Sequence, residues 1–277
     1  MPPPTDPPSA AHPSLAEIEG MIVDMDGVLW RDRAMLPGVA EFFEALNARQ
    51  LPFVIATNNA TSAASVICER LVSAGVSLSE AQVITSAQAA AAFLQQQVGA
   101  GTSVYVVGES GLRSAVIEAG MKIVDRAEAA DVVVAGLERG LSWESLSEAT
   151  LAIRAGALFV ATNTDATFPS ERGLLPGAGA VIAALQTASG VNPVVIGKPE
   201  PHLFLVAVDR LGTRRERTLV VGDRLETDIL GARRAGLPSA LVLTGVTRRE
   251  DLPDVDVQPD WVFADLPALT AALETAR

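Results

Sequence analysis

Two aspartates, Asp24 and Asp26, follow the apolar run of residues 21–23 near the start of the chain. Such a run predicts a buried strand, which would present both carboxylates on the loop at its end. In open parallel sheets, ligands bind beyond the carboxyl ends of the strands. There, one carboxylate can act as a nucleophile while the other donates and accepts protons. Because Asp-x-Asp-Gly also occurs in ordinary turns, this interpretation needs support from the rest of the chain.

A second polar segment, Thr57-Asn58-Asn59, follows the apolar run of residues 53–56. A hydroxyl, an amide and backbone N–H groups at the start of a helix can hold a phosphate group. The same residue types are also preferred as helix caps. The two interpretations are compatible if the cap lies further along the segment, at Thr61 or Ser62, while Thr57 and Asn58 face a ligand.

Lys198 follows a third apolar run, residues 194–196. Only two of the 21 basic residues are lysines, Lys122 and Lys198, so a lysine at the end of a predicted strand is an uncommon choice in this chain. The ordinary alternative is a solvated surface lysine. At a ligand site, a compact ammonium would neutralise a phosphoryl oxygen and lower the pKa of a neighbouring carboxylate.

Asp223 follows a fourth apolar run, residues 219–221, and Asp228 lies shortly after it. Hard cations such as Mg²⁺ take oxygen ligands, often one or two carboxylates together with water and substrate phosphate. Asp24 and Asp223 could supply such ligands from adjacent strand ends. For Asp228 two interpretations stay open: an acid in the first turn of the following helix, or a group outside the metal's own ligands that positions a bound water or Lys198.

Composition limits the class of protein. The chain has 277 residues, 49% hydrophobic content and a mean hydropathy of +0.30, which allows one or two domains with a large core. A net charge of −12 argues against nucleic acid as a partner but not against a small phosphorylated molecule. No apolar stretch is long enough to span a membrane. The N-terminus does not resemble a secretory signal, and the single cysteine, Cys68, excludes an intramolecular disulfide framework. These features favour a cytoplasmic protein.

Apolar runs typical of strands alternate with amphipathic, helix-like stretches along most of the chain. This alternation predicts βαβ units and parallel sheets, and the nearly all-apolar strands indicate sheets that are covered on both faces. The predicted strands are residues 21–23, 53–56, 104–107, 132–135, 158–161, 194–196, 219–221 and 240–243, and the predicted helices are residues 39–48, 63–74, 87–97, 143–155, 202–211 and 228–235.

The candidate site segments divide the chain unevenly. Residues 85–188 have their own alternation of strands and helices but contain none of the four segments. The simplest organisation is a core domain of residues 15–84 and 189–277, interrupted by an inserted domain of residues 85–188. Residues 1–14 form a Pro-rich tail that is expected to be flexible.

In this order, D-x-D-G, T-N-N, a late lysine and G-D-x-x-x-x-D resemble the haloacid dehalogenase superfamily. The insertion is similar to the type IIA cap of the NagD-like or 4-nitrophenylphosphatase family. The segments that fit that family are DVVVAG (131–136), ATNTDATFP (161–169), GLLPGAGA (173–180) and GKP (197–199). In that superfamily a Thr-Leu-Tyr-like segment commonly follows D-x-D-G. Here Val28-Leu29-Trp30 takes its place, a conservative change that does not affect Asp24 or Asp26. The resemblance implies a Rossmann-like parallel-sheet core with an inserted α/β cap domain.

The resemblance also implies roles for the residues, those of a Mg²⁺-dependent phosphatase acting on a small phosphorylated metabolite. Asp24 would be the nucleophile that forms an aspartyl-phosphate, and Asp26 the general acid and base. Mg²⁺ would be held by the Asp24 and Asp223 carboxylates and the Asp26 carbonyl. Lys198 would complement the charge of the phosphoryl group, and Asp228 would lie outside the metal's ligands. Thr57, Asn58 and Asn59 would bind the phosphoryl group. Asn163, Asp165 and Phe168 would contact the rest of the substrate.

Asn163, Asp165 and Phe168 also have ordinary interpretations, as turn residues and a core aromatic. Two rival functions stay open. A phosphonatase-type hydrolase would need a Schiff-base lysine from the cap, where Lys122 is the only lysine. A non-catalytic protein that binds a phosphate ligand would be expected to have lost one of Asp24, Asp26 and Asp223, and all three are present. Similar proteins often form dimers through the cap, so a homodimer is possible here.

Overall fold

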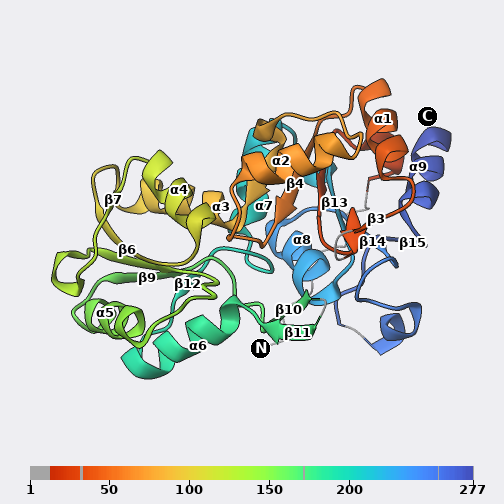
Figure 1. Ribbon diagram of the computed structural model, residues 1–277. Coiled ribbons are helices and arrows are strands. Elements are labelled where there is room, and N and C mark those ends of the chain that lie inside the picture. Colours follow the sequence, from red (N-terminus) through yellow and green to blue (C-terminus); the bar gives the residue numbers. More distant parts are fainter. Residues whose placement is uncertain (1–12, 32–33, 171, 255, 277) are drawn as a thin grey trace, which may run out of the picture.

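The computed structural model describes residues 13–31, 34–170, 172–254 and 256–276. Two parallel sheets, each flanked by helices, form two units that lie side by side (Figure 1). This arrangement confirms the predicted α/β class with a parallel-sheet core. The predicted tail, residues 1–14, lies almost wholly outside the described residues. In the described part of the chain, no helix combines the length and the apolar character that crossing a membrane requires.

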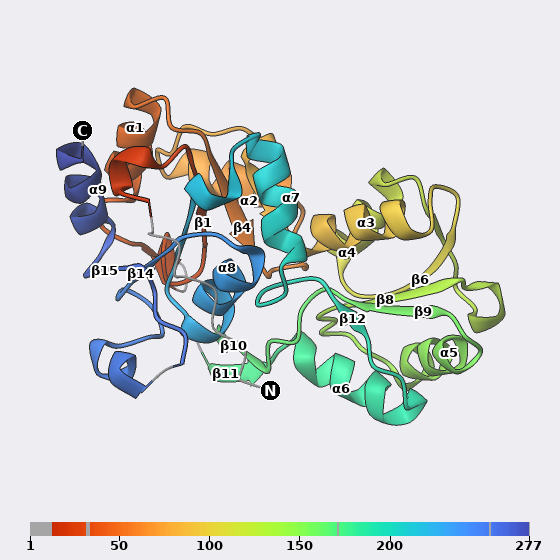
Figure 2. The same ribbon diagram turned by 180° about the vertical axis from the view of Figure 1, so that it is seen from behind.

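The core sheet has six strands in the order β15-β14-β13-β1-β4-β5, and every neighbouring pair is parallel. Successive residues point to opposite faces: Met21 and Val23 pack with helices α1, α2 and α9, whereas Ile22 packs with α7 and α8. Figure 2 shows α7 lying across β1 and β4. The elements are β1 (Gly20–Val23), β4 (Phe53–Thr57), β5 (Val83–Thr85), β13 (Thr218–Gly222), β14 (Ser239–Val242), β15 (Trp261–Phe263), α1 (Val39–Ala48), α2 (Ala64–Ser73), α7 (His202–Leu211), α8 (Leu230–Ala235) and α9 (Leu266–Thr275).

The second sheet has five parallel strands in the order β12-β9-β8-β6-β7. Helices α5 and α6 cover one face, and α4 and part of α3 cover the other. Its elements are α3 (Ser86–Gln97), β6 (Ser103–Val107), α4 (Ser110–Glu118), β7 (Lys122–Ile123), β8 (Val132–Ala135), α5 (Trp143–Arg154), β9 (Leu158–Ala161), α6 (Ala178–Ser189) and β12 (Val194–Val195). The second sheet thus takes its last strand from beyond residue 188, the domain boundary that the sequence predicts.

One hydrophobic cluster continues from the core unit into the second unit. It joins Ile22 and Phe204 of the core to Leu94 of α3 and Val104 of β6. Helix α3 packs against both α7 and α4, so it connects the two units physically as well as along the chain.

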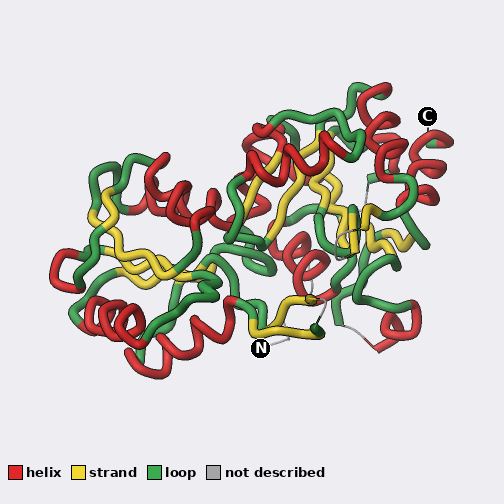
Figure 3. The backbone as a smooth tube through the Cα atoms, viewed as in Figure 1, coloured by secondary structure: helices red, strands yellow, loops and turns green. Residues whose placement is uncertain are grey.

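Two antiparallel hairpins lie outside the main sheets (Figure 3). One pairs β2 (Trp30–Arg31) with β3 (Ala34–Met35), and the other pairs β10 (Thr167–Ser170) with β11 (Gly173–Pro176). Shorter helical turns are Leu15–Glu17, Glu80–Gln82, Ala127–Ala129, Leu225–Ile229, Arg215–Arg217 and Arg249–Asp254.

Helix α1 shows why the local sequence specifies its element. Val39, Phe42, Phe43 and Leu46 are buried, and their spacing places them on one face of a helix. Gly38, which precedes the helix, has a φ of 80°, a conformation that glycine adopts without strain. The predicted bounds of α1 and α7 agree with the structure.

Candidate active site

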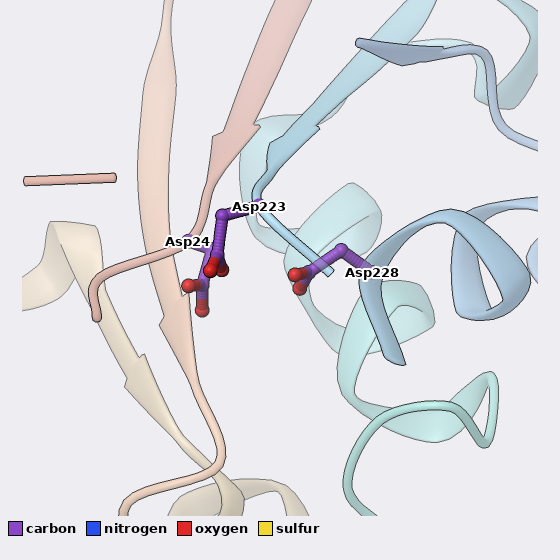
Figure 4. A group of neighbouring side chains, drawn as sticks. All are labelled: Asp24, Asp223 and Asp228. Atoms are coloured by element: carbon purple, nitrogen blue, oxygen red, sulfur yellow. The ribbon is translucent and has the colours of Figure 1, made fainter. Parts of the chain in front are cut away.

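Three aspartates from adjacent parts of the core come together at the carboxyl edge of the sheet. Asp24 follows β1 and Asp223 follows β13, and these strands are neighbours, with Val23 opposite Val221. Asp228 lies on the turn beyond Asp223 (Figure 4). One oxygen from each carboxylate lies within 4.8 Å of the other two. The pairing of β1 with β13 therefore brings Asp24 beside two acids that lie about 200 residues further along the chain.

The surroundings of Asp223 hold its carboxylate in one position. Its side chain is buried, and Oδ2 accepts a hydrogen bond from the backbone N–H of Val246 at 2.7 Å. A Cβ atom would come within 2.5 Å of Oδ2 if added to Gly27, and within 1.8 Å if added to Gly245. Burial, followed by the nearby charge of Asp228, raises the pKa of Asp223 to about 7. Only glycines leave enough room for this carboxylate.

Lys198 lies between two of the acids. Its Nζ is 2.5 Å from Oδ1 of Asp24 and 2.8 Å from Oδ1 of Asp228, and only 3% of the residue is exposed. Burial alone would lower the pKa of Lys198, but Asp228 and Asp24 raise it above its ordinary value. The surface alternative is thus excluded: Lys198 is a buried ammonium shared by two carboxylates.

Asp228 lies in the π-helical turn Leu225–Ile229 that leads into α8. Its Oδ2 accepts a hydrogen bond from the backbone N–H of Arg224 at 3.1 Å, while Oδ1 holds Lys198. A Cβ atom on Gly222 would lie 2.2 Å from Asp228, so this glycine lets the turn approach the strand end. The carboxylate therefore bonds both to its own turn and to Lys198, and its predicted position outside the ligands of a metal stays a prediction.

The donor set fits a hard divalent cation. Oδ1 of Asp223 is buried and has no hydrogen-bond partner among the described residues, and carboxylate oxygens are the ligands that Mg²⁺ prefers. When all are ionised, Asp24, Asp223, Asp228 and Lys198 carry two net negative charges, which a divalent cation would balance. Burial, with the charges of Asp228 and Asp223, raises the pKa of Asp24 even though Lys198 opposes the shift. A bound cation would favour the ionised form.

Asp26 and Thr57 line the same cavity as Asp24 and Lys198. Asp26 is exposed, and its Oδ1 accepts a hydrogen bond from the indole N–H of Trp30 at 2.8 Å. Thr57, at the end of β4, is buried, and its Oγ1 accepts a hydrogen bond from the backbone N–H of Asn59. The side-chain Oδ1 of Asn59 in turn accepts from the backbone N–H and the hydroxyl of Thr61, so this side chain supports its own loop.

Asn58 connects the core loop to other segments. Its Oδ1 accepts from the backbone N–H of Lys198 at 2.8 Å, and its Nδ2 lies 3.1 Å from the Lys198 carbonyl and 3.2 Å from both carboxylate oxygens of Asp165. Its backbone carbonyl accepts from Ser86 at 2.6 Å and from Asn163 at 2.8 Å. The side chain therefore holds protein segments together, and its predicted contact with substrate stays a prediction.

The predicted substrate residues of the inserted unit also lie at this cavity. Asn163 is buried, and its Oδ1 accepts from the backbone N–H of Asp165 at 3.1 Å. Burial raises the pKa of Asp165, although its hydrogen bond from Asn58 opposes the shift. Phe168, on β10, is half-buried, with the Arg139 guanidinium 5.9 Å from its ring centre.

The cavity encloses about 230 Å³ between the core and the inserted unit. Arg139, Arg224 and Thr227 also line it and are not among the predicted site residues. Arg224 directly follows Asp223, and Arg139 lies soon after β8, so position after a strand would have been a usable signal for both.

Comparison with known proteins identifies the family. The haloacid dehalogenase-like hydrolase family matches residues 21–122, and a related HAD-hydrolase-like family matches residues 195–269. An acid sugar phosphatase of Staphylococcus aureus is 36% identical over 260 residues, which is 94% of this chain and all of that protein. This chain belongs to the haloacid dehalogenase-like hydrolase family.

Solved structures agree with this family. A 4-nitrophenylphosphatase from Thermotoga maritima is 36% identical, with a TM-score of 0.88 over 95% of this chain and all of that chain. A glycerol phosphate phosphatase from Mycobacterium tuberculosis, solved with magnesium, is 42% identical, with a TM-score of 0.86 over 93% of this chain and 78% of that chain. The predicted resemblance to the 4-nitrophenylphosphatase group is confirmed, and so is the expectation of a phosphatase-type hydrolase with a core and an inserted cap.

Proposed function

We propose that this protein is a Mg²⁺-dependent phosphatase of small phosphomonoesters that works through an aspartyl-phosphate on Asp24. One observation carries the proposal: Lys198 is buried between Asp24 and Asp228, next to Asp223, whose buried Oδ1 has no hydrogen-bond partner in the part of the chain that the structure describes. A structural ion pair would not need a third carboxylate with one buried oxygen that has no hydrogen-bond partner among the described residues. A divalent cation and a phosphoryl group would use these atoms together.

In the first step, the Asp24 carboxylate attacks phosphorus and forms an acyl-phosphate bond as the bond to the leaving oxygen breaks. Asp26 gives its proton to that oxygen, so the product leaves as an alcohol. In the second step, Asp26 takes a proton from water, which attacks phosphorus and releases phosphate from Asp24. Lys198 complements the charge of the phosphoryl oxygens, and Asp228 keeps the ammonium in place.

Mg²⁺ would be held by the Asp24 and Asp223 carboxylates and the Asp26 carbonyl, and it would neutralise charge on the phosphoryl oxygens. Asp228 would remain outside its ligands. Thr57, with its buried hydroxyl at the end of β4, is the proposed phosphoryl contact, together with the loop of Asn58 and Asn59.

The proposed substrate is a small phosphorylated metabolite. A cavity of about 230 Å³ is below the usual range for drug-sized ligands, and the relatives are named for sugar phosphate, glycerol phosphate and 4-nitrophenyl phosphate. Asn163, Asp165 and Phe168 are proposed to contact the leaving group. A cytoplasmic protein without nucleic-acid or membrane partners remains the expectation, and a homodimer through the cap would be tested by light scattering.

The test is hydrolysis of 4-nitrophenyl phosphate and of a panel of glycerol and sugar phosphates, with Mg²⁺ and with EDTA. Activity that EDTA removes and Mg²⁺ restores supports the proposal. Turnover that is independent of metal contradicts it. Phosphate binding without turnover of any ester would instead favour the non-catalytic alternative. The phosphonatase alternative gains no support, because Lys122 is exposed at the edge strand β7, and Lys198 is the lysine that lines the cavity.

A further inference from the structure

Trp30 directly contacts Asp26, the residue to which the proposed function gives proton transfer. Its indole Nε1–H donates a hydrogen bond to Oδ1 of Asp26 at 2.8 Å. Trp30 is 2% exposed, whereas Asp26 is exposed and lines the cavity. The bond therefore connects an acid that is open to the ligand to a donor that is fixed in the protein interior.

The position of the indole is determined by its own turn. The backbone N–H of Gly27 donates to the Trp30 carbonyl at 2.8 Å, and the N–H of Leu29 donates to the Met25 carbonyl at 2.9 Å. These bonds fold the segment back, so that the first residue of β2 lies beside the loop that carries Asp26. These bonds hold the backbone of Trp30, from which the ring projects, beside the Asp26 loop.

The two faces of the ring are also in contact with the protein. Trp30 belongs to the buried cluster that contains Met25, Val28 and Leu29. On one face, the Arg70 guanidinium of α2 lies 3.9 Å from the ring centre, a distance typical of a cation–π contact. A buried Trp usually places its N–H on a hydrogen-bond acceptor, and here that acceptor is a carboxylate at the candidate active site.

We infer that Trp30 is a positioning residue that holds the Asp26 carboxyl in the orientation for proton transfer; the inference rests on the proposed function. Because Oδ1 is engaged by the indole, Oδ2 remains to carry the proton. That proton passes from Oδ2 to the leaving oxygen as the phosphorus–oxygen bond breaks, and Oδ2 later accepts a proton from water. The indole keeps its own proton throughout. An exposed aspartate without this bond would sample several rotamers, and few of them would reach the leaving oxygen.

The consequence is a dependence on the leaving group. An alkyl phosphate such as glycerol phosphate releases a strongly basic alkoxide unless it is protonated, whereas 4-nitrophenolate leaves readily without a proton. Trp30→Phe keeps a ring in the core but removes the donor. We expect kcat/KM for glycerol phosphate to fall about tenfold, and kcat/KM for 4-nitrophenyl phosphate to fall by less than about twofold. Trp261→Phe, a change at a half-buried tryptophan on the edge strand β15, is the matched control and should change both values equally little.

Asp26→Asn separates this inference from the proposed function. If Asp26 is the general acid, kcat/KM, which reports the steps up to release of the alcohol, should fall far more for glycerol phosphate than for 4-nitrophenyl phosphate in this variant. Adding Trp30→Phe should then have no further selective effect. Equal losses of kcat/KM for both esters in Asp26→Asn would contradict the acid role itself. A selective loss in Asp26→Asn combined with an unselective or absent effect in Trp30→Phe would overturn the inference about Trp30 alone.

A spectroscopic measurement keeps the inference testable if Trp30→Phe does not fold. The chain has three tryptophans, Trp30, Trp143 and Trp261, and hence three indole N–H signals in an ¹⁵N-labelled sample. Asp26→Ala should move the Trp30 signal upfield and speed its exchange with solvent, while the other two signals stay in place. An unchanged Trp30 signal would overturn the inference.

Discussion

The two walls of the cavity differ in how firmly their side chains are held. On the core wall, Lys198 and Asp228 are buried and paired. Their neighbour Asp223, which does not line the cavity, is packed closely against Gly27 and Gly245. On the cap wall, the Arg139 side chain is 61% exposed and pairs with Glu109, and Phe168 is only half-buried. These core residues are thus more deeply buried and more closely packed than Arg139 and Phe168 of the cap wall.

This difference follows from the positions of the residues. The core acids lie at the ends of buried parallel strands, where backbone pairing fixes each Cα atom. The cap residues lie on a hairpin and on a loop, which belong to the more variable parts of folds. We therefore expect changes in the core wall to remove the chemistry, and changes in the cap wall to alter which ester is preferred.

The largest effect is expected from Asp24→Asn. The change is nearly isosteric but removes the nucleophile, so kcat should fall by at least about 10⁴-fold in any ester. The circular dichroism spectrum should match that of the unchanged protein. Near-normal turnover in a folded sample would contradict a covalent role for Asp24. It would also remove the expected difference between the effects of changes in the two walls.

Gly245→Ala tests whether the tight fit around Asp223 matters. The new Cβ atom would lie 1.8 Å from Oδ2 unless the carboxylate moved. We expect kcat/KM to fall about 100-fold, the scale seen when a group that orients a metal ligand is lost, with a higher Mg²⁺ concentration needed for half-activity. Gly140→Ala is the control, because no atom lies within 4 Å of its added Cβ. Equal activity of the two variants would contradict this account.

Asn58→Asp tests the side-chain link between the two walls. The new carboxylate would face Asp165 at the distance where Asn58 now donates a hydrogen bond. Repulsion and the lost bonds should lower kcat/KM about tenfold. Adding Asp165→Asn restores a donor and an acceptor to the pair and should recover part of that loss. If the loss in the double variant equals the sum of the losses in the two single variants, the bond between Asn58 and Asp165 does not account for the fall in kcat/KM.

The pH dependence of Mg²⁺ binding tests the charge of the core wall without an activity assay. The pKa of Asp223 is about 7 in the fold, against about 4 in an unfolded chain. The folded metal-free protein therefore holds this proton more tightly, and its free energy of unfolding should fall as pH rises from about 4 to about 7. Because Mg²⁺ binds the ionised form, the rise in Tm on adding Mg²⁺ should grow by several degrees between about pH 5 and pH 8. Calorimetry would show this, and a constant rise would contradict it.

The smallest effect is expected from Phe168→Ala on the cap wall. Loss of an aromatic contact should raise KM for 4-nitrophenyl phosphate about threefold and leave kcat within about twofold. Glycerol phosphate, which has no ring, should be less affected. A large loss of kcat with both esters would mean that the cap wall also takes part in the chemistry.

Local sequence determined the elements and most of the candidate site. Apolar runs followed by acids or hydroxyls predict the ends of β1, β4 and β13, because burial and turn chemistry act within a few residues. The same signal places Asp24, Thr57 and Asp223 at one edge of the sheet. Helices α4, α6 and α9 and the short hairpins are not among the predicted elements, although the buried residues of α6, Val181, Ile182 and Leu185, have helical spacing.

Only the tertiary structure decided which of these groups meet. Residues 194–196 are predicted to form one more core strand, yet β12 (Val194–Val195) pairs with β9 of the second sheet, and Lys198 follows it at the candidate site. The bond from Asn58 to Asp165 joins residues that are more than 100 positions apart. Hydrophobic periodicity indicates which face of a helix or strand is buried, but not which element packs against that face. That choice depends on the packing of the whole chain, so it appears only in the fold.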